Sequence, residues 1–447
     1  MESWLDIFPQ TPINETRQKQ LRATWQYARE RSPYYSKLLP EIEPQALRFM
    51  HLLELPITTK KELSEFQEEF RCSTEIPAYM FFTGGSTGVP TVLCGSESEL
   101  EMMQSSLPPH TPGQKRPLTM MTGGGTHGYV PLVPGRKGCI MIPLRSRHNY
   151  ELAWRLLSAE HHFEGYESKI TRAQLPLPAV KKLVHYLLEE KYDLSLLALD
   201  YVGTFAWHLS DDWRYLISSV LGAVVIDLYG FTEIRTARAF ECNGCGYYHL
   251  GANVIWEVVD QWTRRHITDG VGQLLVSSLL PECQEMVLFR FDSGDLVKLG
   301  PYCPEFGDRG FRHMGRQSQT FAVREGDDWT YAIFPTHIQE AVDLDQRVAR
   351  FSNLRHGGVT KSEDDSFPKW RVRETEDVGM PVFNVEVEMK ASPHLFRDEW
   401  KSFEAGLLAD LTELNKELDR LLNEGKAKLN IVGLPPGSLS DDEIFIC

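Results

Sequence analysis

The sequence predicts an α/β fold, organised as a large N-terminal domain and a smaller α+β domain at the C-terminus. From about residue 78 onward, short apolar runs such as Gln273-Leu274-Leu275-Val276 are separated by glycine and proline, which is typical of strands. Helical stretches such as 180–190 alternate with these runs, and this alternation favours sheets covered by helices. The length of 447 residues also suggests roughly two to four domains.

The first 65 or so residues are predicted to be mainly helical. Residues 15–31 place Leu21, Trp25 and Ala28 at the three- and four-residue spacing of one helix face. Pro33 then marks the end of this helix, because proline cannot continue the backbone hydrogen bonding.

The C-terminal part combines a strand with a long helix. Residues 384–388 alternate between polar and apolar side chains, and a helix is expected over 398–423. We expect its apolar stripe to pack against the small sheet rather than to form a coiled coil. The stripe consists of Phe403, Leu407, Leu411, Leu414 and Leu418. Gly315–Gln319 is the candidate hinge, and it divides the chain into domains 1–316 and 317–447.

Composition and charge argue against several classes of protein. The net charge of −15 disfavours nucleic acid or an anionic membrane as the main partner, because binding phosphates needs a basic surface. No run of about 18 apolar residues is present, so no membrane span is expected. The N-terminal residues Met1–Asp6 are acidic and lack the basic and apolar regions of a signal peptide. Eight scattered cysteines do not suggest a disulfide scaffold, so we expect a cytoplasmic protein with reduced thiols.

The most informative segment is the loop that runs from Thr83 to Thr91. Its glycines and hydroxyl side chains expose backbone N–H groups and hydroxyls together, which is what a polyphosphate needs. Glycine suits such a loop because it adopts positive φ angles and lets a ligand approach closely. Taken alone, a run of this kind is more often a plain surface turn. The candidate phosphate-binding residues are Thr83, Gly84, Gly85, Ser86, Thr87 and Gly88.

Three further motifs follow this loop in order. They are Tyr229–Glu233, which comes after an apolar run that indicates a buried strand, then Asp292–Leu296, and then Gly315–Gln319. With these motifs the chain resembles the adenylate-forming superfamily, which includes acyl-CoA synthetases, adenylation domains of peptide synthetases and luciferases. Within it, the chain is similar to the phenylacetate–CoA ligase-like branch. Signatures of that branch are also matched at 28–35, 55–60 and 334–340.

The resemblance implies a ligase that activates a carboxylic acid with ATP and Mg²⁺, through an acyl-adenylate. Tyr229 would stack on adenine, Thr232 would contact the α-phosphate, and Glu233 would bind Mg²⁺. A single carboxylate together with phosphate oxygens is the usual set of Mg²⁺ ligands in such sites. The alternative for Glu233 is a surface carboxylate at a turn.

Two residues match the family's ribose contacts. Asp295 corresponds to the ribose-binding aspartate, and the two acceptor oxygens of one carboxylate suit a vicinal diol. Asp292 lies nearby, but the spacing from Arg316 favours Asp295. Arg316 would contact ribose or phosphate, and a structural ion pair is its alternative. A turn aspartate beside Gly294 is the alternative for Asp295.

Two glycine-containing segments are expected to line the adenine and acyl pockets. Gly203 and Thr204 stand where the family lines adenine and substrate. Residues 123–128 are expected to line the acyl pocket, and the glycines there suit a flat aryl acid. His127 is the candidate for positioning the carboxylate, and an ordinary loop histidine is the alternative.

Cysteines and a histidine resemble the structural zinc site of related ligases. That site uses a Cys, a His seven residues on, and a later Cys-x-Cys; Cys242, His249 and Cys303 match three of its ligands. Glu305 stands where the fourth cysteine belongs, and Cys245 is the candidate to replace it in a tetrahedral Cys₃His site. The alternative is a set of buried free cysteines with a histidine that faces solvent.

The C-terminal end departs from the family. Its members use a lysine for adenylation, and Pro436–Leu439 is in register with the segment that precedes this lysine. The chain continues with Ser440 and three acids, and Phe445 stands about where the lysine belongs. Losing one such contact typically costs roughly 10²–10³ in rate. Lys426 and Lys428 are candidate substitutes, although we expect them to be solvated loop lysines.

Two more family positions differ, since Val89 replaces the phosphate-loop lysine and Gln319 the hinge aspartate. Three functions therefore stay open. The first is a ligase that passes the acyl group to coenzyme A, a carrier-protein thiol or a small amine, with domain rotation about Gln319. The second performs only acyl transfer or condensation from a preformed adenylate or thioester. The third is a non-catalytic nucleotide- or acyl-binding protein. The oligomeric state also stays open, although this branch is often dimeric and a homodimer is one of the alternatives.

Overall fold

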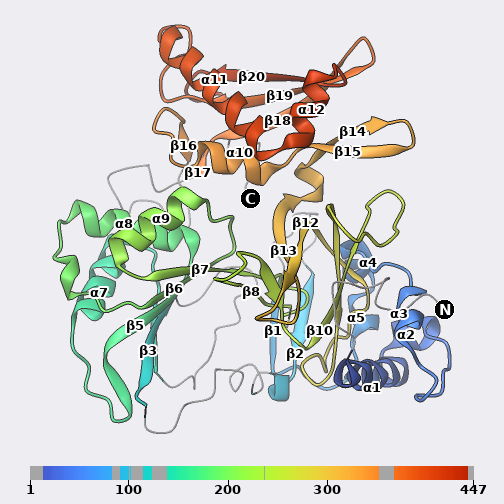
Figure 1. Cartoon of the computed structure of the whole chain (residues 1–447). Helices are drawn as coiled ribbons and strands as arrows, with labels where there is room; N and C mark the ends of the chain where they lie inside the picture. The colour runs from blue at the N-terminus through green and yellow to red at the C-terminus, as the bar shows by residue number, and fades with distance from the viewer. Residues whose placement is uncertain are drawn as a thin grey trace. The chain divides into compact units, whose positions relative to one another are not determined.

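The chain forms two compact units in the computed structural model, which describes residues 14–82, 91–99, 101, 114–122, 138–235, 237–351 and 367–440 (Figure 1). The first unit comprises Met1–Arg116, Gly123–Cys139 and Ile226–His313. The second comprises Pro117–Thr122, Ile140–Val225 and Met314–Cys447. The α/β fold class is confirmed. The proposed moving domains, 1–316 and 317–447, stay a prediction, because packing does not test which parts rotate together.

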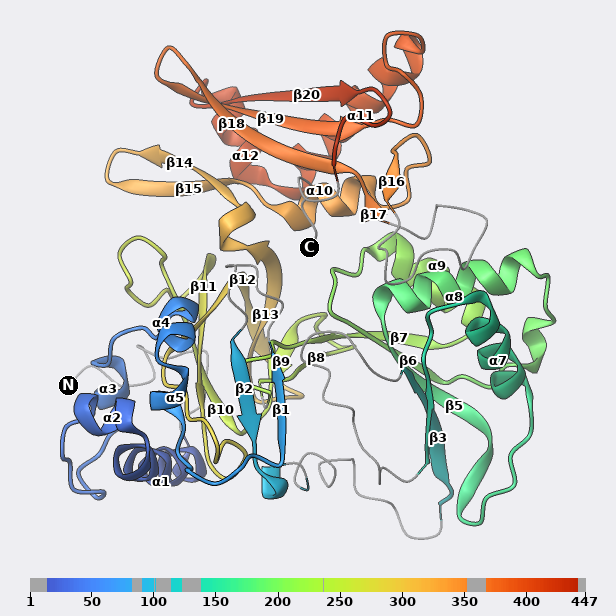
Figure 2. The same ribbon diagram turned by 180° about the vertical axis from the view of Figure 1, so that it is seen from behind.

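Five helices begin the first unit, and they lie beside β10 and β11 (Figures 1 and 2). The predicted helix over 15–31 is confirmed as α1, which begins after Asn14, whose side chain accepts a hydrogen bond from the Arg17 backbone N–H at 2.9 Å. Leu21, Trp25 and Ala28 are buried on its inner face. The helices are α1 (Glu15–Arg31), α2 (Pro33–Leu38), α3 (Phe49–Leu53), α4 (Lys60–Glu65) and α5 (Gln67–Phe70).

The first unit also contains most of the strands that carry predicted site residues. They are hydrogen-bonded in the order β10-β11-β12-β13-β9-β8, and β1 pairs separately with β2 in an antiparallel hairpin. The strands are β1 (Tyr79–Phe82), β2 (Val92–Gly95), β8 (Ala239–Glu241), β9 (Tyr248–Leu250), β10 (Val254–Val259), β11 (Val271–Ser278), β12 (Phe291–Cys303) and β13 (Asp308–Arg316). One buried cluster joins this sheet to the five helices, and in it the rings of Trp25 and Tyr35 pack on Phe289.

In the second unit, helices pack on a sheet with the order β6-β5-β3-β4. Strands β5 and β6 are parallel, and α8 contacts both of them. The elements are β3 (Arg116–Thr122), β4 (Cys139–Ile142), α7 (Arg147–Ser158), β5 (Tyr166–Pro176), α8 (Leu177–Glu189), a 3₁₀ helix (Leu194–Leu196), β6 (Tyr201–Phe205) and α9 (Asp211–Leu221). Strand β7 (Val224–Tyr229) then carries the chain back to the first unit.

The C-terminal part of the second unit is built around the sheet β18-β19-β20, and α11 and α12 lie along one face of it (Figure 2). It has its own buried core, separate from that of the preceding helices and strands. Its elements are a 3₁₀ helix (Gln317–Gln319), β14 (Phe321–Glu325), β15 (Asp328–Ile333), α10 (Pro335–Val342), β16 (Arg350–Phe351), β17 (Phe367–Pro368), β18 (Trp370–Asp377), β19 (Met380–Glu388), α11 (Arg397–Leu414), α12 (Lys416–Asn423) and β20 (Lys428–Leu434).

The predicted strand at 384–388 is confirmed within β19, but the prediction of one helix over 398–423 is wrong at Asn415. The Asn415 side chain accepts hydrogen bonds from the backbone N–H groups of Glu417 and Leu418, and it donates to the carbonyl of Ala332. Asn415 therefore caps a new helix, α12, and anchors it to β15. As a consequence Leu414 is 42% exposed, whereas the other predicted stripe residues are buried. In the part of the chain that is described, no helix has both the length and the apolar character needed to cross a bilayer.

Candidate functional site

The predicted ribose and adenine residues meet in the first unit. Tyr229 ends β7, and its hydroxyl donates to Oδ2 of Asp295 on β12 at 2.7 Å. His313 on β13 places its Nε2 3.5 Å from the other oxygen, Oδ1, of the same carboxylate. The side chain of Asp295 is only 3% exposed, so its charge is largely removed from water. Three side chains from distant parts of the sequence thus form one polar cluster.

A β-bulge within β12 explains how Asp295 is presented. Gly294 has a φ of +76°, and its backbone N–H donates to Oδ1 of Asp292 at 2.8 Å. The hydroxyl of Ser293 accepts from the backbone N–H of Asp295 at 3.1 Å. Asp292 is therefore occupied in shaping the bulge, whereas the carboxylate of Asp295 reaches Tyr229. This arrangement is consistent with Asp295, rather than Asp292, as the residue that faces a ligand.

Glu233, the candidate Mg²⁺ ligand, follows β7 in a region of mixed charge. Its side chain is 7% exposed, and Oε1 lies 3.4 Å from Nζ of Lys60, the first residue of α4. The alternative that Glu233 is a surface carboxylate is wrong, because the side chain is nearly buried and paired. A nearly buried carboxylate with one cationic partner can exchange that partner for a metal ion that brings its own phosphate ligands.

A cavity in the first unit borders Glu233, and Arg235 and Glu99 line it. An Arg235 guanidinium nitrogen lies 3.6 Å from Oε2 of Glu99, and the group sits 4.3 Å from the ring centre of Tyr79. Burial raises the pKa of Glu99 to about 7 and lowers the pKa of Arg235 to about 9. Arg235 is therefore already engaged by Glu99, while Lys60 is the cation that pairs with Glu233.

Several predicted site residues lie elsewhere. Gly203 and Thr204 are on β6, and Arg316 ends β13; all three belong to the second unit, where Thr204 is fully buried. Thr232 lies beside Glu233 in the first unit. The phosphate loop from Thr83 to Gly88, His127, Val89 and Phe445 fall outside the described residues.

The C-terminal segment that precedes the expected lysine position is firmly held. Glu388 on β19 accepts hydrogen bonds from the backbone N–H groups of Gly437 and Leu439, at 2.9 and 2.7 Å. The two candidate substitute lysines are engaged in surface ion pairs. Lys426 pairs with Glu325 at 2.7 Å, and Lys428 pairs with Asp377 at 2.5 Å. Both side chains are about half exposed, which agrees with the expectation of solvated lysines, but Lys428 begins β20 and so is not a loop residue.

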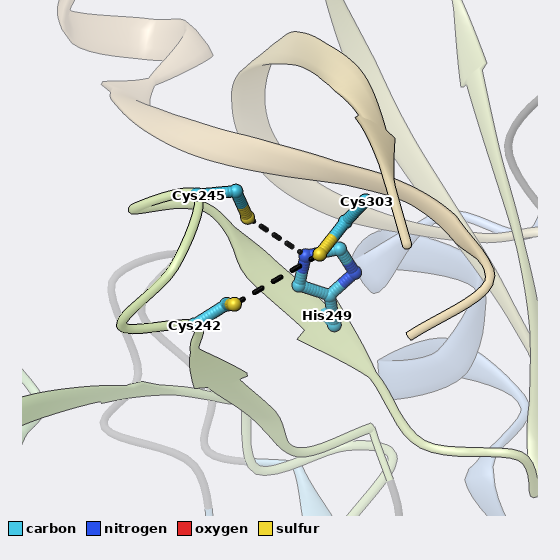
Figure 3. Close-up of side chains that lie close together, drawn as sticks. All are labelled: Cys242, Cys245, His249 and Cys303. Carbon is cyan, nitrogen blue, oxygen red and sulfur yellow. Dashed lines mark hydrogen bonds between the residues drawn. The ribbon is translucent and has the colours of Figure 1, made fainter. Parts of the chain in front are cut away.

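Four predicted metal ligands come together at the turn between β8 and β9, as Figure 3 shows. Cys242 and Cys245 lie on the turn, His249 on β9, and Cys303 at the end of β12. The turn is closed by hydrogen bonds from the Gly246 N–H to the Cys242 carbonyl and from the Gly244 N–H to the Cys242 sulfur. The four ligand atoms all lie within 4.8 Å of one another.

The distances fit zinc. A tetrahedral ion with Zn–S bonds of about 2.3 Å places two sulfurs about 3.8 Å apart. The sulfurs of Cys242 and Cys303 are 3.9 Å apart, and the Cys245 sulfur is 3.3 Å from His249 Nε2. His249 Nδ1 lies 2.7 Å from Oδ1 of Asp308, the arrangement that fixes the tautomer and the ring of a zinc ligand. The alternative of a solvent-facing histidine is wrong, since His249 is 2% exposed.

Sequence reasoning missed three residues of these sites. Lys60 stood only in a family signature, and nothing in the sequence indicated that it pairs with Glu233. His313 and Asp308 are single residues on β13 whose importance comes from strand pairing. An alternation signal marks a strand but does not show which partner each side chain meets across it.

No family model matches the chain. It is 24% identical to phenylacetate–coenzyme A ligase of Thermus thermophilus over 364 residues, which cover 75% of this chain and 76% of that enzyme. The resemblance to the adenylate-forming superfamily is confirmed. A crystal structure of 2-hydroxyisobutyryl-CoA ligase in the postadenylation state matches with a TM-score of 0.63 at 17% identity, over 98% of this chain and 90% of that one. An anthranilate CoA ligase matches with a TM-score of 0.50 at 14% identity, over 82% and 64% of the two chains.

These comparisons place the chain beside the phenylacetate–CoA ligase-like branch, and the prediction of an enzyme of the ligase class is confirmed. The two 2-hydroxyisobutyryl-CoA ligase structures share the fold over 98% and 97% of this chain, including the C-terminal part.

Proposed function

We propose that this protein activates a carboxylic acid with ATP as an acyl-adenylate and transfers the acyl group to a thiol or amine acceptor. The observation that carries the proposal is the meeting of Tyr229 and Asp295, which belong to two separate sequence motifs and form one hydrogen-bonded pair. Similar structures support it, because 2-hydroxyisobutyryl-CoA ligase was solved with 2-HIB-AMP and also with CoA. The phenylacetate–coenzyme A ligase relative supports CoA as an acceptor.

In the proposed reaction, Asp295 receives the ribose. Its carboxylate offers about four lone-pair positions, so it can accept two ribose hydroxyls while Tyr229 and His313 stay near it. Thr232 and the segment from Thr83 to Gly88 would bind phosphates. Arg316 would contact ribose or phosphate, and Gly203 and Thr204 would line adenine.

Glu233 would hold Mg²⁺, which neutralises the charge that develops on the phosphates. The nearly buried Glu233 carboxylate fits this role, since it needs a cation beside it in any state. Lys60, which pairs with Glu233, places a second positive charge beside this carboxylate. Both reactants are anions, so the charge held there favours their approach.

The finer assignments are also proposals. We propose an aryl acid as the substrate, positioned by His127, and coenzyme A, a carrier-protein thiol or a small amine as the acceptor. The enzyme would act in the cytoplasm as a homodimer, without nucleic acid or membrane as a partner. Its C-terminal domain, 317–447, would rotate about Gln319 between the two half-reactions.

For the Cys242, Cys245, His249 and Cys303 cluster we propose a structural Zn²⁺. Four protein ligands leave no open position for a substrate, so the ion would stabilise the turn between β8 and β9 and the end of β12. The fit of the sulfur–sulfur distance and the Asp308–His249 contact support this assignment.

A second candidate is acyl transfer or condensation alone, from a preformed adenylate or thioester. It is favoured by Phe445 at the position of the family's lysine, since the second half-reaction does not need that residue. The structure adds that Lys426 and Lys428 are held in surface ion pairs.

The variant Glu233→Ala separates the two candidates, and Glu97→Ala, at an exposed position, is the matched control. If the protein adenylates acids, Glu233→Ala abolishes Mg²⁺-dependent exchange of pyrophosphate into ATP, while Glu97→Ala keeps it. Under the transfer-only alternative, the wild type shows no exchange, and both variants still transfer acyl groups from a supplied adenylate. If Glu233→Ala changed neither binding nor activity, the assignment of the nucleotide site would be wrong.

A further inference from the structure

His313 faces the carboxylate of Asp295, which binds ribose in the proposed function. Its Nε2 lies 3.5 Å from Asp295 Oδ1, while the Tyr229 hydroxyl binds Oδ2 at 2.7 Å. The two contacts approach different oxygens of one nearly buried carboxylate. The contact to His313 is at ion-pair distance and is not a hydrogen bond, so it restrains Oδ1 less tightly than the Tyr229 hydroxyl restrains Oδ2.

The strand fixes the histidine in place. His313 lies two residues after Phe311 on β13, so both side chains point to the same face of the sheet. Tyr229 contacts both rings there, with centroid distances of 5.2 Å to Phe311 and 5.6 Å to His313. Phe311 is fully buried, whereas His313 is only partly exposed at the edge of the cluster. A side chain on a packed strand positions its neighbours more accurately than one on a loop.

A vicinal diol requires a carboxylate in one orientation. Each hydroxyl must find its own oxygen, so rotation of the carboxylate about its last bond weakens both hydrogen bonds at once. The Tyr229 hydroxyl alone restrains one oxygen of Asp295. The His313 ring lies beside the other oxygen and adds a second, longer-range restraint on this rotation.

We propose that His313 is a positioning residue that orients Asp295 for the two ribose hydroxyls and so makes the site selective for ribonucleotides over deoxyribonucleotides. This inference rests on the proposed function, because it presumes that Asp295 binds the ribose of ATP. It adds a residue that no motif of the chain indicated and a measurable specificity.

Binding of ATP and 2′-deoxy-ATP, measured by calorimetry, tests the proposal. The variants are His313→Leu, which removes the ring N–H, and His313→Gln, whose amide keeps a donor near the position of Nε2. Lys298→Gln, at an exposed position on the strand that carries Asp295, is the control. The 2′-hydroxyl of ATP would form a hydrogen bond to the charged Asp295 carboxylate, and 2′-deoxy-ATP lacks this hydroxyl. The wild type should therefore bind ATP more tightly than 2′-deoxy-ATP, by about 10-fold or more.

We expect His313→Leu to lose most of this preference, by about 10-fold, while His313→Gln and Lys298→Gln keep it. A His313→Leu variant that binds both nucleotides more weakly but with the wild-type ratio has lost only structure, and this result overturns the proposal. An unchanged ratio and affinity overturn it as well. If His313→Leu does not fold, His313→Asn takes its place, because its shorter amide cannot reach the Nε2 position.

The test distinguishes this inference from the proposed function. If the wild type binds neither nucleotide, the proposed nucleotide site fails and the role of His313 fails with it. If the wild type binds ATP and exchanges pyrophosphate, but the preference for ribose does not depend on His313, only the present inference is overturned.

Discussion

The contact between His249 and Asp308 allows a quantitative prediction about the metal site. Asp308 is buried and lies 2.7 Å from His249 Nδ1, so it holds the ring with Nε2 directed at the Cys245 sulfur. Partners of this kind typically change metal affinity by about 10–100-fold. Asp308→Asn keeps an oxygen that can accept from Nδ1–H and loses only the charge, so we expect about a 10-fold loss of zinc affinity. Asp308→Ala removes the acceptor, so we expect about a 100-fold loss, or about 2.7 kcal/mol.

Competition with a chromophoric zinc chelator measures these affinities, after the zinc content of the purified protein has been determined. Asp269→Asn is the matched control, because Asp269 is 88% exposed and its contact to Arg309 is long, at 3.9 Å. Wild-type affinity in Asp308→Ala would refute the role of the Asp308–His249 contact. Less than about half an equivalent of zinc in the wild type, together with a Cys242→Ser variant of undiminished stability, would refute the zinc site itself.

Three predictions concern stability, each measured by urea unfolding. Burial raises the pKa of Glu99 to about 7, above its ordinary 4.5, so between these pH values the folded state holds a proton that the unfolded chain releases. The free energy of unfolding should therefore fall as pH rises from about 4.5 to about 7, by up to about 1.4 kcal/mol per pH unit. The variant Glu99→Gln should remove that fall. An equal slope in both proteins would contradict this. Lys181 and Asp343 form a buried ion pair at 2.9 Å, so Lys181→Met should cost about 3–5 kcal/mol, and the double variant with Asp343→Asn should cost less than the two single losses together. Additive losses would argue against the pair. Leu411→Ala should lower the free energy of unfolding by about 2–5 kcal/mol, because Leu411 is buried, whereas Leu414→Ala should change it by less than about 0.5 kcal/mol, because Leu414 is exposed. Similar losses in both variants would show that the helix does not break at Asn415.

The fold class and much of the candidate site could be predicted because their signals are local. The face of α1, the alternation in β19 and the order of the motifs are properties of short segments. The meeting of Cys242 and Cys303 was also predictable, since their spacing resembled a known ligand set. Such patterns can be recognised in the sequence because they do not depend on contacts with distant residues.

Other features depend on pairing between distant residues. The ion pair of Lys60 with Glu233 arises because α4 starts where the loop after β7 passes. The break at Asn415 comes from a side chain that caps α12 and donates to Ala332, a contact made only in the folded chain. Helical periodicity continues through such a residue, so the sequence predicts one helix where the structure has two.

The central claim, that this chain adenylates an acid, is tested most directly by exchange of labelled pyrophosphate into ATP across a panel of aryl and alkyl acids. We expect Mg²⁺-dependent exchange with at least one acid, although Phe445 stands at the position of the usual lysine. Binding of ATP without exchange for any acid, together with acyl transfer to CoA from a supplied adenylate, would contradict it and establish the transfer-only function.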